Sequence, residues 1–447
     1  MKNTYRYHFK NTAKLAYPVA IGQMGHVMMG VVDSLFVGKL GAVPLAAASI
    51  ANSLFFLIFV VGLGVTFAIS PLVAIASSSN KLKECGLILR NGLVINITVA
   101  FLLISVILTG SGFLKYLNQP GDVARLAAIY IRIIGFSILP MMIFQTFRQF
   151  IEGLSIMRPA MIINIVANVV NAFGNWVLVF GKLGLPALGF EGSAIATLIT
   201  RCFMAIVITV YVLRSERFKK FDLKLGIKNL NARISKKILG IGFSSGFQYF
   251  FEVGAFSSAA VMIGWIGTLP LAAHQIALNL ASIPYMAATG ISAAAAIRVG
   301  NATGRGDHAE IRRAGFSAMI LTAFLEIVSG IIFVLFRDFL PSLYINNSQV
   351  ISIASSLLII AAFFQISDGV QAVALGALRG ITDVKIPTFI TFISYWILGL
   401  PAGYLFAFYS GFGVRGVWFG FIVGLTASAL LLTSRFHFGS KKALFNA

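Results

Sequence analysis

Long apolar stretches separated by short polar connections run along the whole chain. A transmembrane helix needs about 20 mainly apolar residues to cross the hydrocarbon core of a bilayer. Twelve stretches meet this requirement, with approximate cores at residues 15–38, 46–76, 87–112, 124–147, 159–181, 190–213, 238–264, 271–297, 312–336, 349–378, 386–408 and 414–434. The pattern therefore predicts an all-α integral membrane protein with twelve transmembrane helices.

The composition excludes a large soluble enzyme. Of the 447 residues, 58% are hydrophobic and 11% are charged, whereas soluble proteins carry about 25% charged residues. The net charge is +21, but the basic residues lie in short connections, so we expect the lipid bilayer as partner and no nucleic acid. Cys85 and Cys202 are too few for a disulfide framework and have no metal-ligand spacing.

The basic residues follow alternate spans. The connections after spans two, four, six, eight and ten and both termini are basic, while the other connections are poorer in Lys and Arg. The positive-inside rule then places both termini in the cytoplasm. The charged stretch after span six divides the chain into an N-terminal six-helix bundle (1–213), a cytoplasmic linker (214–237) and a C-terminal six-helix bundle (238–447).

The two halves resemble each other. Residues 38–47 match residues 264–273 at an offset of 226 (264 − 38), and the register continues with Gly64 and Gly290. Six spans per half give both copies the same orientation, which predicts a pseudo-symmetric parallel repeat about an axis along the membrane normal. Such a duplication is typical of transporters that move two bundles around a central site.

Three acids lie inside predicted spans: Asp33, Glu252 and Asp368. An ionised side chain at the bilayer centre costs about 2.5–3.5 kcal/mol on insertion scales, so such acids are candidate functional residues. At the repeat offset Glu252 corresponds to His26 and Asp33 to Ala259, so the shared fold does not require these acids. The alternative for Glu252 is a structural hydrogen bond to a neighbouring helix.

In the first half, four asparagines recur near helical spacing in span five: Asn164, Asn168, Asn171 and Asn175. One interpretation is hydrogen bonding between helices. The other is a proton or cation site in which Asn171, Asn175 and Thr197 surround Asp33. Pro18 lies fifteen residues before Asp33 (33 − 18) and is expected to bend the first span.

In the second half, Glu252 and Asp368 form a candidate ion site. Two nearby acids in a dry site cannot both stay charged without a cation, so either one holds a proton or the pair binds Na⁺. The candidate neutral partners are Gln248, Tyr249, Gln275, Asn279 and Gln365, each with helix-to-helix hydrogen bonding as the alternative. Arg201 lies in an apolar stretch, where pairing with a buried acid is one explanation.

The sequence contains no GxxxxGK[ST] loop for an ATP motor, no HExxH and no readable Ser-His-Asp arrangement. We therefore expect a transporter rather than an enzyme, with no cofactor beyond a coupling ion, Na⁺ or H⁺. A secondary antiporter is one hypothesis. A flippase for lipid-linked oligosaccharides or other amphipathic lipids is the alternative; it would need basic residues to meet phosphate, for which Arg201 and Arg132 are the candidates.

Several short motifs, taken together in their order, resemble one family. They are Pro18, Val32-Asp33-Ser34 with Gly38, the turns at 44–47 and 270–275, Phe251-Glu252, Arg298-Val299-Gly300, the run 364–368 and the run 376–380. Over essentially the whole chain, the sequence resembles the multidrug and toxic compound extrusion (MATE) family, in its bacterial NorM and DinF-like branch.

This resemblance implies two six-helix bundles that form a V-shaped cleft in the bacterial inner membrane. It implies export of cationic or amphipathic drugs in exchange for Na⁺ or H⁺ by alternating access, and we expect a monomer. The family's first-half site falls on Asp33, Asn171, Asn175 and Thr197, and its second-half site on Glu252 and Asp368. Phe364 stands where some Na⁺-coupled members have tyrosine, so the resemblance leaves the coupling ion open.

Overall fold

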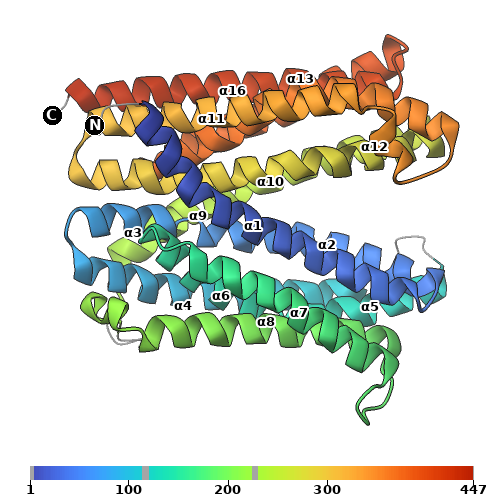
Figure 1. The fold of residues 1–447 in the computed structure, drawn as a ribbon, viewed down its shortest axis with the longest axis horizontal. Coiled ribbons are helices and arrows are strands. Elements are labelled where there is room, and N and C mark those ends of the chain that lie inside the picture. Colours follow the sequence, from blue (N-terminus) through green and yellow to red (C-terminus); the bar gives the residue numbers. More distant parts are fainter. Residues whose placement is uncertain (1–4, 113–119, 224–229, 446–447) are drawn as a thin grey trace. The chain divides into compact units, whose positions relative to one another are not determined.

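The computed structural model describes residues 5–112, 120–223 and 230–445, and nearly all of them are helical (Figure 1). Within these ranges twelve helical stretches are long and apolar enough to cross a bilayer, which confirms the predicted number of spans. Residues 224–229 of the predicted linker lie outside the described residues.

Nine spans are single helices: α1 (Tyr5–Gly38), α4 (Leu82–Gly110), α7 (Arg158–Phe180), α8 (Gly189–Arg214), α9 (Ala232–Ile266), α10 (Thr268–Arg305), α11 (His308–Leu335), α13 (Ser348–Gly380) and α16 (Val414–Phe445). The other three are interrupted: α2 (Ala42–Thr66) with α3 (Ile69–Ser78), α5 (Gly121–Phe136) with α6 (Ile138–Gly153), and α14 (Lys385–Phe392) with α15 (Leu400–Tyr404). Two short helices lie in connections, η2 (Glu216–Phe221) and α12 (Phe339–Ser342).

The interruptions have local causes. Between α5 and α6, the Ser137 hydroxyl donates to the Ile134 carbonyl at 2.5 Å, a bond that competes with the helix ladder and favours a bend. In the eleventh span the π-helical turns η3 (Ile393–Gly399) and η4 (Leu405–Tyr409) flank Pro401. Proline has no N–H to donate, so the regular ladder cannot pass through it.

The chain forms two compact units. The first unit is Ile21–Gly246, and the second unit comprises the residues up to Ala20 together with those from Phe247 onward. Helices α2 to α8 lie in the first unit and α10 to α16 in the second, whereas α1 and α9 are each divided between the two. The units therefore differ from the predicted bundles 1–213 and 238–447, because the beginnings of α1 and α9 pack with the opposite halves.

Close contacts at glycines explain why the starts of α1 and α9 pack with the opposite halves of the sequence. A side chain at Gly64 of α2 would meet the backbone of Gly246 in α9. A side chain at Gly290 of α10 would meet the backbone of Ala16 and Ala20 in α1. The two contacts are related by the repeat offset, since both 290 − 64 and 246 − 20 equal 226. Small residues let membrane helices approach closely, so the duplicated sequence produces the same crossing twice.

A buried arginine also joins the beginning of α1 to the second unit. Arg298 of α10 donates through Nη1 to the His8 carbonyl at 2.8 Å and to the Thr12 hydroxyl at 2.5 Å. Its Nη2 lies 2.6 Å from Nδ1 of His8. These bonds satisfy a guanidinium that is only 7% exposed, so they position the first turns of α1 on α10.

The turn before α2 recurs before α10. Gly41 and Gly267, again 226 residues apart (267 − 41), precede the two helices with φ values of 121° and 152°. Both values lie in the left-handed region that glycine adopts without a steric cost. The matching residues 38–47 and 264–273 therefore encode the same helix–turn–helix.

Candidate functional site

The first cluster surrounds Asp33, which is 6% exposed near the end of α1. Asn171 and Asn175 of α7 donate through Nδ2 to its Oδ1 at 3.0 and 2.8 Å. Thr197 of α8 donates from its hydroxyl to Oδ2 at 2.8 Å. The structure thus brings together all four residues of the predicted first-half site, and its donors are suited to hold a carboxylate.

The other two asparagines of the stripe do different work. Asn168 donates through Nδ2 to the Gly25 carbonyl of α1 at 2.8 Å. Asn164 lies against Gly22, where an added β-carbon would come within 3.1 Å of its Nδ2. One turn of the stripe therefore holds two helices together, and the next turn binds the Asp33 carboxylate.

A cavity of about 500 Å³ opens beside Asp33 within the first unit. Thr197 and Arg201 also line it, together with His26, Asn52 and the rings of Phe55, Phe56 and Phe59. Arg201 donates through Nη1 to the Ser137 hydroxyl at 2.6 Å, and its guanidinium carbon lies 4.8 Å from the centre of the Phe55 ring. The cavity therefore presents one carboxylate and one guanidinium beside aromatic rings.

The second cluster lies in the second unit. Glu252 of α9 is 7% exposed and accepts a hydrogen bond of 2.5 Å from the hydroxyl of Tyr285 on α10. Asp368 of α13 is 8% exposed, and its carboxyl lies close enough to that of Glu252 for their charges to interact. Its Oδ1 has no hydrogen-bond partner within the described chain. The two predicted acids therefore share one site.

The neutral residues predicted to surround Glu252 and Asp368 form hydrogen bonds to other groups. Gln248 donates to the Val384 carbonyl and the Thr388 hydroxyl, both at 3.1 Å, and so joins α9 to α14. Gln275 donates to Asn279 one turn further along α10 at 3.3 Å.

The remaining two candidates also hold helices. Gln365 donates to the Ala281 carbonyl at 3.1 Å, and Tyr249 bonds to Arg379. The partner found for Glu252 is Tyr285, which the sequence did not indicate because its position depends on how α9 and α10 pack.

The sequence interpretation also missed Glu326 of α11. This acid is 1% exposed, and neither carboxyl oxygen has a hydrogen-bond partner among the residues described. It packs against Gly369, the residue after Asp368. A single acid in an apolar run is the signal that identified Glu252, and the same signal would have found Glu326.

Glu152 of α6 is an equally buried glutamate with an ordinary structural role. Its Oε1 accepts from Nε of Arg148 at 2.7 Å, one helical turn away. Among the described residues, Glu152 is thus a buried glutamate with a charged partner, whereas the carboxyl oxygens of Glu326 have no hydrogen-bond partner.

A Na⁺ ion at Glu252 and Asp368 stays a prediction. The carboxyl oxygens and the Tyr285 hydroxyl are the hard donors that such ions prefer. Across the described ranges, however, no group of three or more His, Cys, Asp or Glu residues could hold a metal ion. The bend predicted at Pro18 also stays a prediction; Pro18 lies in α1, three residues before Ile21, where the first unit begins.

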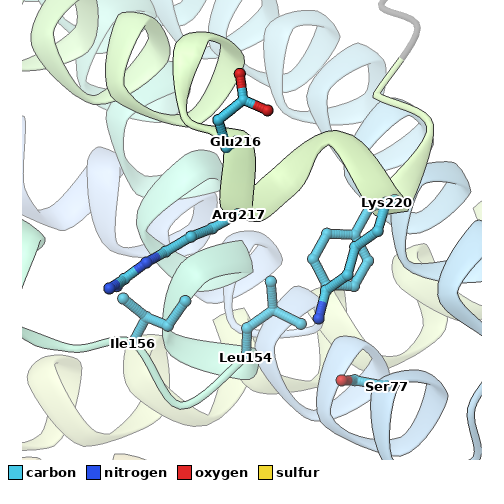
Figure 2. A pocket seen from close by; sticks show the side chains of 7 residues that line it. Ser77, Leu154, Ile156, Glu216, Arg217 and Lys220 are labelled. Atoms are coloured by element: carbon cyan, nitrogen blue, oxygen red, sulfur yellow. The ribbon is translucent and has the colours of Figure 1, made fainter.

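A separate pocket of about 430 Å³ lies at the η2 turn (Figure 2). Its lining residues are Ser77, Leu154, Ile156, Glu216, Arg217, Lys220 and Phe221. Glu216 pairs with Lys219 at 2.6 Å, and in Figure 2 its carboxylate is turned away from Arg217 and Lys220. This basic pocket contains none of the predicted site residues.

Comparison with known proteins follows the same division of the chain. The MatE family model matches residues 18–177 and 245–405. The two segments begin 227 residues apart (245 − 18), within one residue of the repeat offset.

The sequence is similar to several curated bacterial proteins. It is 36% identical to the probable multidrug resistance protein NorM of Agrobacterium fabrum, covering 96% of this chain and 93% of that protein. It is 34% identical to the multidrug resistance protein NorM of Vibrio vulnificus strain YJ016, covering 97% of this chain and 96% of that protein. With MdtK of Yersinia pseudotuberculosis the identity is 33%, over 96% of this chain and 95% of that protein.

The fold is also that of solved structures. A eukaryotic MATE transporter, AtDTX14, superposes with a TM-score of 0.89 at 22% identity, covering 98% of both chains. A MATE protein in its bent conformation superposes with a TM-score of 0.90 at 18% identity, covering 98% of this chain and 96% of that one. From the family-model match and the near full-length relatives, the chain belongs to the MatE family, the multidrug and toxic compound extrusion family that its motifs resemble.

Proposed function

We propose that this chain is a secondary active antiporter that exports cationic or amphipathic drugs in exchange for Na⁺ or H⁺. The observation that carries the proposal is the shared, buried site of Glu252 and Asp368 inside the membrane spans. Negative charge at that depth is tolerated when a cation or a proton neutralises it. A cationic drug and the coupling ion would therefore compete for the same carboxylates.

The Asp33 cluster supports a role for the first unit in the same process. Its carboxylate lines a cavity of about 500 Å³ that is also lined by aromatic rings. Apolar walls with a few placed polar groups are typical of small-molecule sites. An amphipathic cation would place its ring system on Phe56, which is 46% exposed, and its charge near Asp33.

The proposal includes the setting of the protein. We place it in the bacterial inner membrane as a monomer with both termini in the cytoplasm, and we assign it no enzyme activity. The excess of Lys and Arg in alternate connections supports this orientation. Labelling of cysteines introduced into opposite connections, with a reagent that does not cross membranes, tests the orientation.

Efflux from drug-sensitive bacterial cells tests the function. Glu252→Gln and Asp368→Asn remove one charge each while keeping the side-chain shape. We expect each to lower the rate of ethidium efflux by about tenfold or more, which corresponds to a loss of about 1.4 kcal/mol of transition-state stabilisation. Glu310→Gln is the matched control, because Glu310 pairs with Arg305 at the start of α11. Unchanged efflux in both site variants would overturn the assignment.

Transport assays in proteoliposomes with either a Na⁺ gradient or a proton gradient identify the coupling ion. We expect ethidium movement to follow either a Na⁺ gradient or a proton gradient, and to lose that dependence in Asp368→Asn. Ethidium movement that ignores both gradients contradicts antiport.

The flippase alternative is favoured by Arg201, which lines the cavity beside Asp33. A guanidinium is suited to bind phosphate through two parallel hydrogen bonds. Loss of fluorescent phospholipid movement in Arg201→Gln, with ethidium efflux retained, would favour this alternative over drug export.

A further inference from the structure

Glu326 is buried, and its carboxyl group has no hydrogen-bond partner among the described residues. Its side chain is 1% exposed, and both carboxyl oxygens lack a hydrogen-bond partner within the described residues. An ionised carboxylate in such a place is strongly unfavourable, whereas the neutral acid costs far less. Glu152, the buried glutamate with an arginine at 2.7 Å, shows what a structural glutamate in this chain looks like.

The position of Glu326 directs it toward α13. The stripe Thr322, Glu326 and Gly330 is buried, whereas Ile327 and Ile331 on the other face of α11 are exposed. Gly330 packs on the backbone of Ala362. A β-carbon at Gly369 would lie 2.6 Å from Cγ2 of Thr322 and 2.8 Å from Cγ of Glu326. The absence of a side chain at residue 369 thus makes room for the Glu326 carboxyl.

This room lies next to the ion site. Gly369, against which Glu326 packs, directly follows Asp368 in α13. Asp368 Oδ1 and the Thr322 hydroxyl also lack partners within the part of the chain that is described. Unsatisfied oxygens from two helices therefore surround one stretch of the α11–α13 interface, where buried polar groups ordinarily find partners.

We propose that Glu326 is a third proton-exchanging carboxyl of the second unit and that it releases its proton when a cation binds beside Asp368. The inference rests on the proposed function. In the exchange, the O–H bond of Glu326 breaks, its electron pair stays on the carboxylate, and the proton passes to water. The positive charge of the bound cation compensates the new negative charge, so each cation displaces one proton more than Glu252 and Asp368 alone would release.

Proton counting tests the inference. Purified protein in weakly buffered detergent solution is titrated with tetraphenylphosphonium, and the protons released per bound cation are measured. We expect Glu326→Gln to release about one proton fewer than the parent, because it removes one of the coupled titrating groups. Glu326→Asp, which keeps a carboxyl, is expected to restore the release. Thermal unfolding of both variants reports whether the interface still folds.

Carbodiimide labelling gives a readout that does not require transport. Dicyclohexylcarbodiimide modifies protonated carboxyls in apolar surroundings, so mass spectrometry should find Glu326 modified, with tetraphenylphosphonium lowering the modification. Glu152 is the matched control and should stay unmodified, because its carboxylate is ion-paired.

Different results separate the two proposals. If the folded Glu326→Gln variant releases as many protons as the parent, or if Glu326 is not labelled, the inference is overturned while drug export stands. If the parent neither exports ethidium nor releases protons on binding tetraphenylphosphonium, the proposed function has failed. Labelling of Glu326 would then still report its protonated state.

Discussion

At the scale of single residues, the Asp33 carboxylate depends on its donors. Hydrogen bonds to a charged group contribute about 1.5–3 kcal/mol each, and Asn175 supplies one of the two bonds at 2.8 Å. We expect Asn175→Ala to lower ethidium efflux by about tenfold, since about 1.4 kcal/mol corresponds to that factor. The initial rate of efflux at matched expression is the measurement.

The control for this prediction is one turn away on the same helix. Asn168→Ala removes the bond to the Gly25 carbonyl but none of the hydrogen bonds that Asp33 accepts from Asn171, Asn175 and Thr197. It should lower the melting temperature and leave the ion dependence of efflux unchanged. Equal loss of efflux in the two variants would mean that the whole stripe only holds helices together.

The sequence predicted those site residues whose pattern lies within a single helix. Asn171 and Asn175 were found because they recur on one face of α7, and Asp33 because an acid in an apolar run is conspicuous. Tyr285 was not found, since a tyrosine in a membrane helix is ordinary until packing places it on Glu252. Gln248 and Gln275 are single polar residues in apolar spans, and their bonds go to partners other than Glu252 and Asp368.

At the scale of helices, the repeated glycine crossing can be tested twice. Gly64→Val would force a side chain into the backbone of Gly246, and Gly290→Val into that of Ala16 and Ala20. Overpacking of this kind costs about 1–3 kcal/mol or more. We expect both variants to lower the melting temperature in detergent, and Gly64→Val to lower it more. An added β-carbon at residue 64 would lie 2.1 Å from Cα of Gly246, whereas one at residue 290 would lie 2.8 Å from the Ala16 carbonyl oxygen.

Gly240→Ala provides the comparison. Gly240 lies in α9 with nothing within 4 Å of the added carbon, so this change should keep or raise the melting temperature, given the better helix propensity of alanine. A Gly64→Val protein that melts like the parent would show that the crossing tolerates a wider separation.

The number and order of the spans were predictable, because length and hydropathy determine what can cross a bilayer. The interruption at Ser137 and the π turns around Pro401 were not predicted, since apolar composition is the same on both sides of them. The division of α1 and α9 was also missed. A run of apolar residues indicates that a helix crosses the membrane, but it does not indicate which neighbouring helix it packs against.

At the scale of the whole molecule, the start of α1 packs in the second unit and the start of α9 packs in the first. We therefore expect each half of the sequence to need a segment of the other half to fold stably. A fragment of residues 1–223 lacks Gly242 and Gly246, which pack against Val65 and Gly64. We expect this fragment to be degraded faster by protease than a fragment of residues 1–246, which contains the whole first unit. Limited proteolysis of both fragments in detergent measures the difference.

Co-expression of the two fragments is a second test of this dependence. The fragment 1–223 should co-purify with a tagged fragment 230–447, because each supplies the segment that the other unit lacks. Equal protease resistance of 1–223 and 1–246, with no co-purification, would contradict the mutual dependence.

The contact between the beginning of α1 and α10 has a consequence for how the protein is made. Ala20 leaves the ribosome early, but Gly290, against which it packs, is synthesised 270 residues later (290 − 20). The start of α1 therefore lacks this neighbour until α2 to α8, all of α9 and the first part of α10 have been synthesised. The earliest segment to be translated is among the last to find its neighbours.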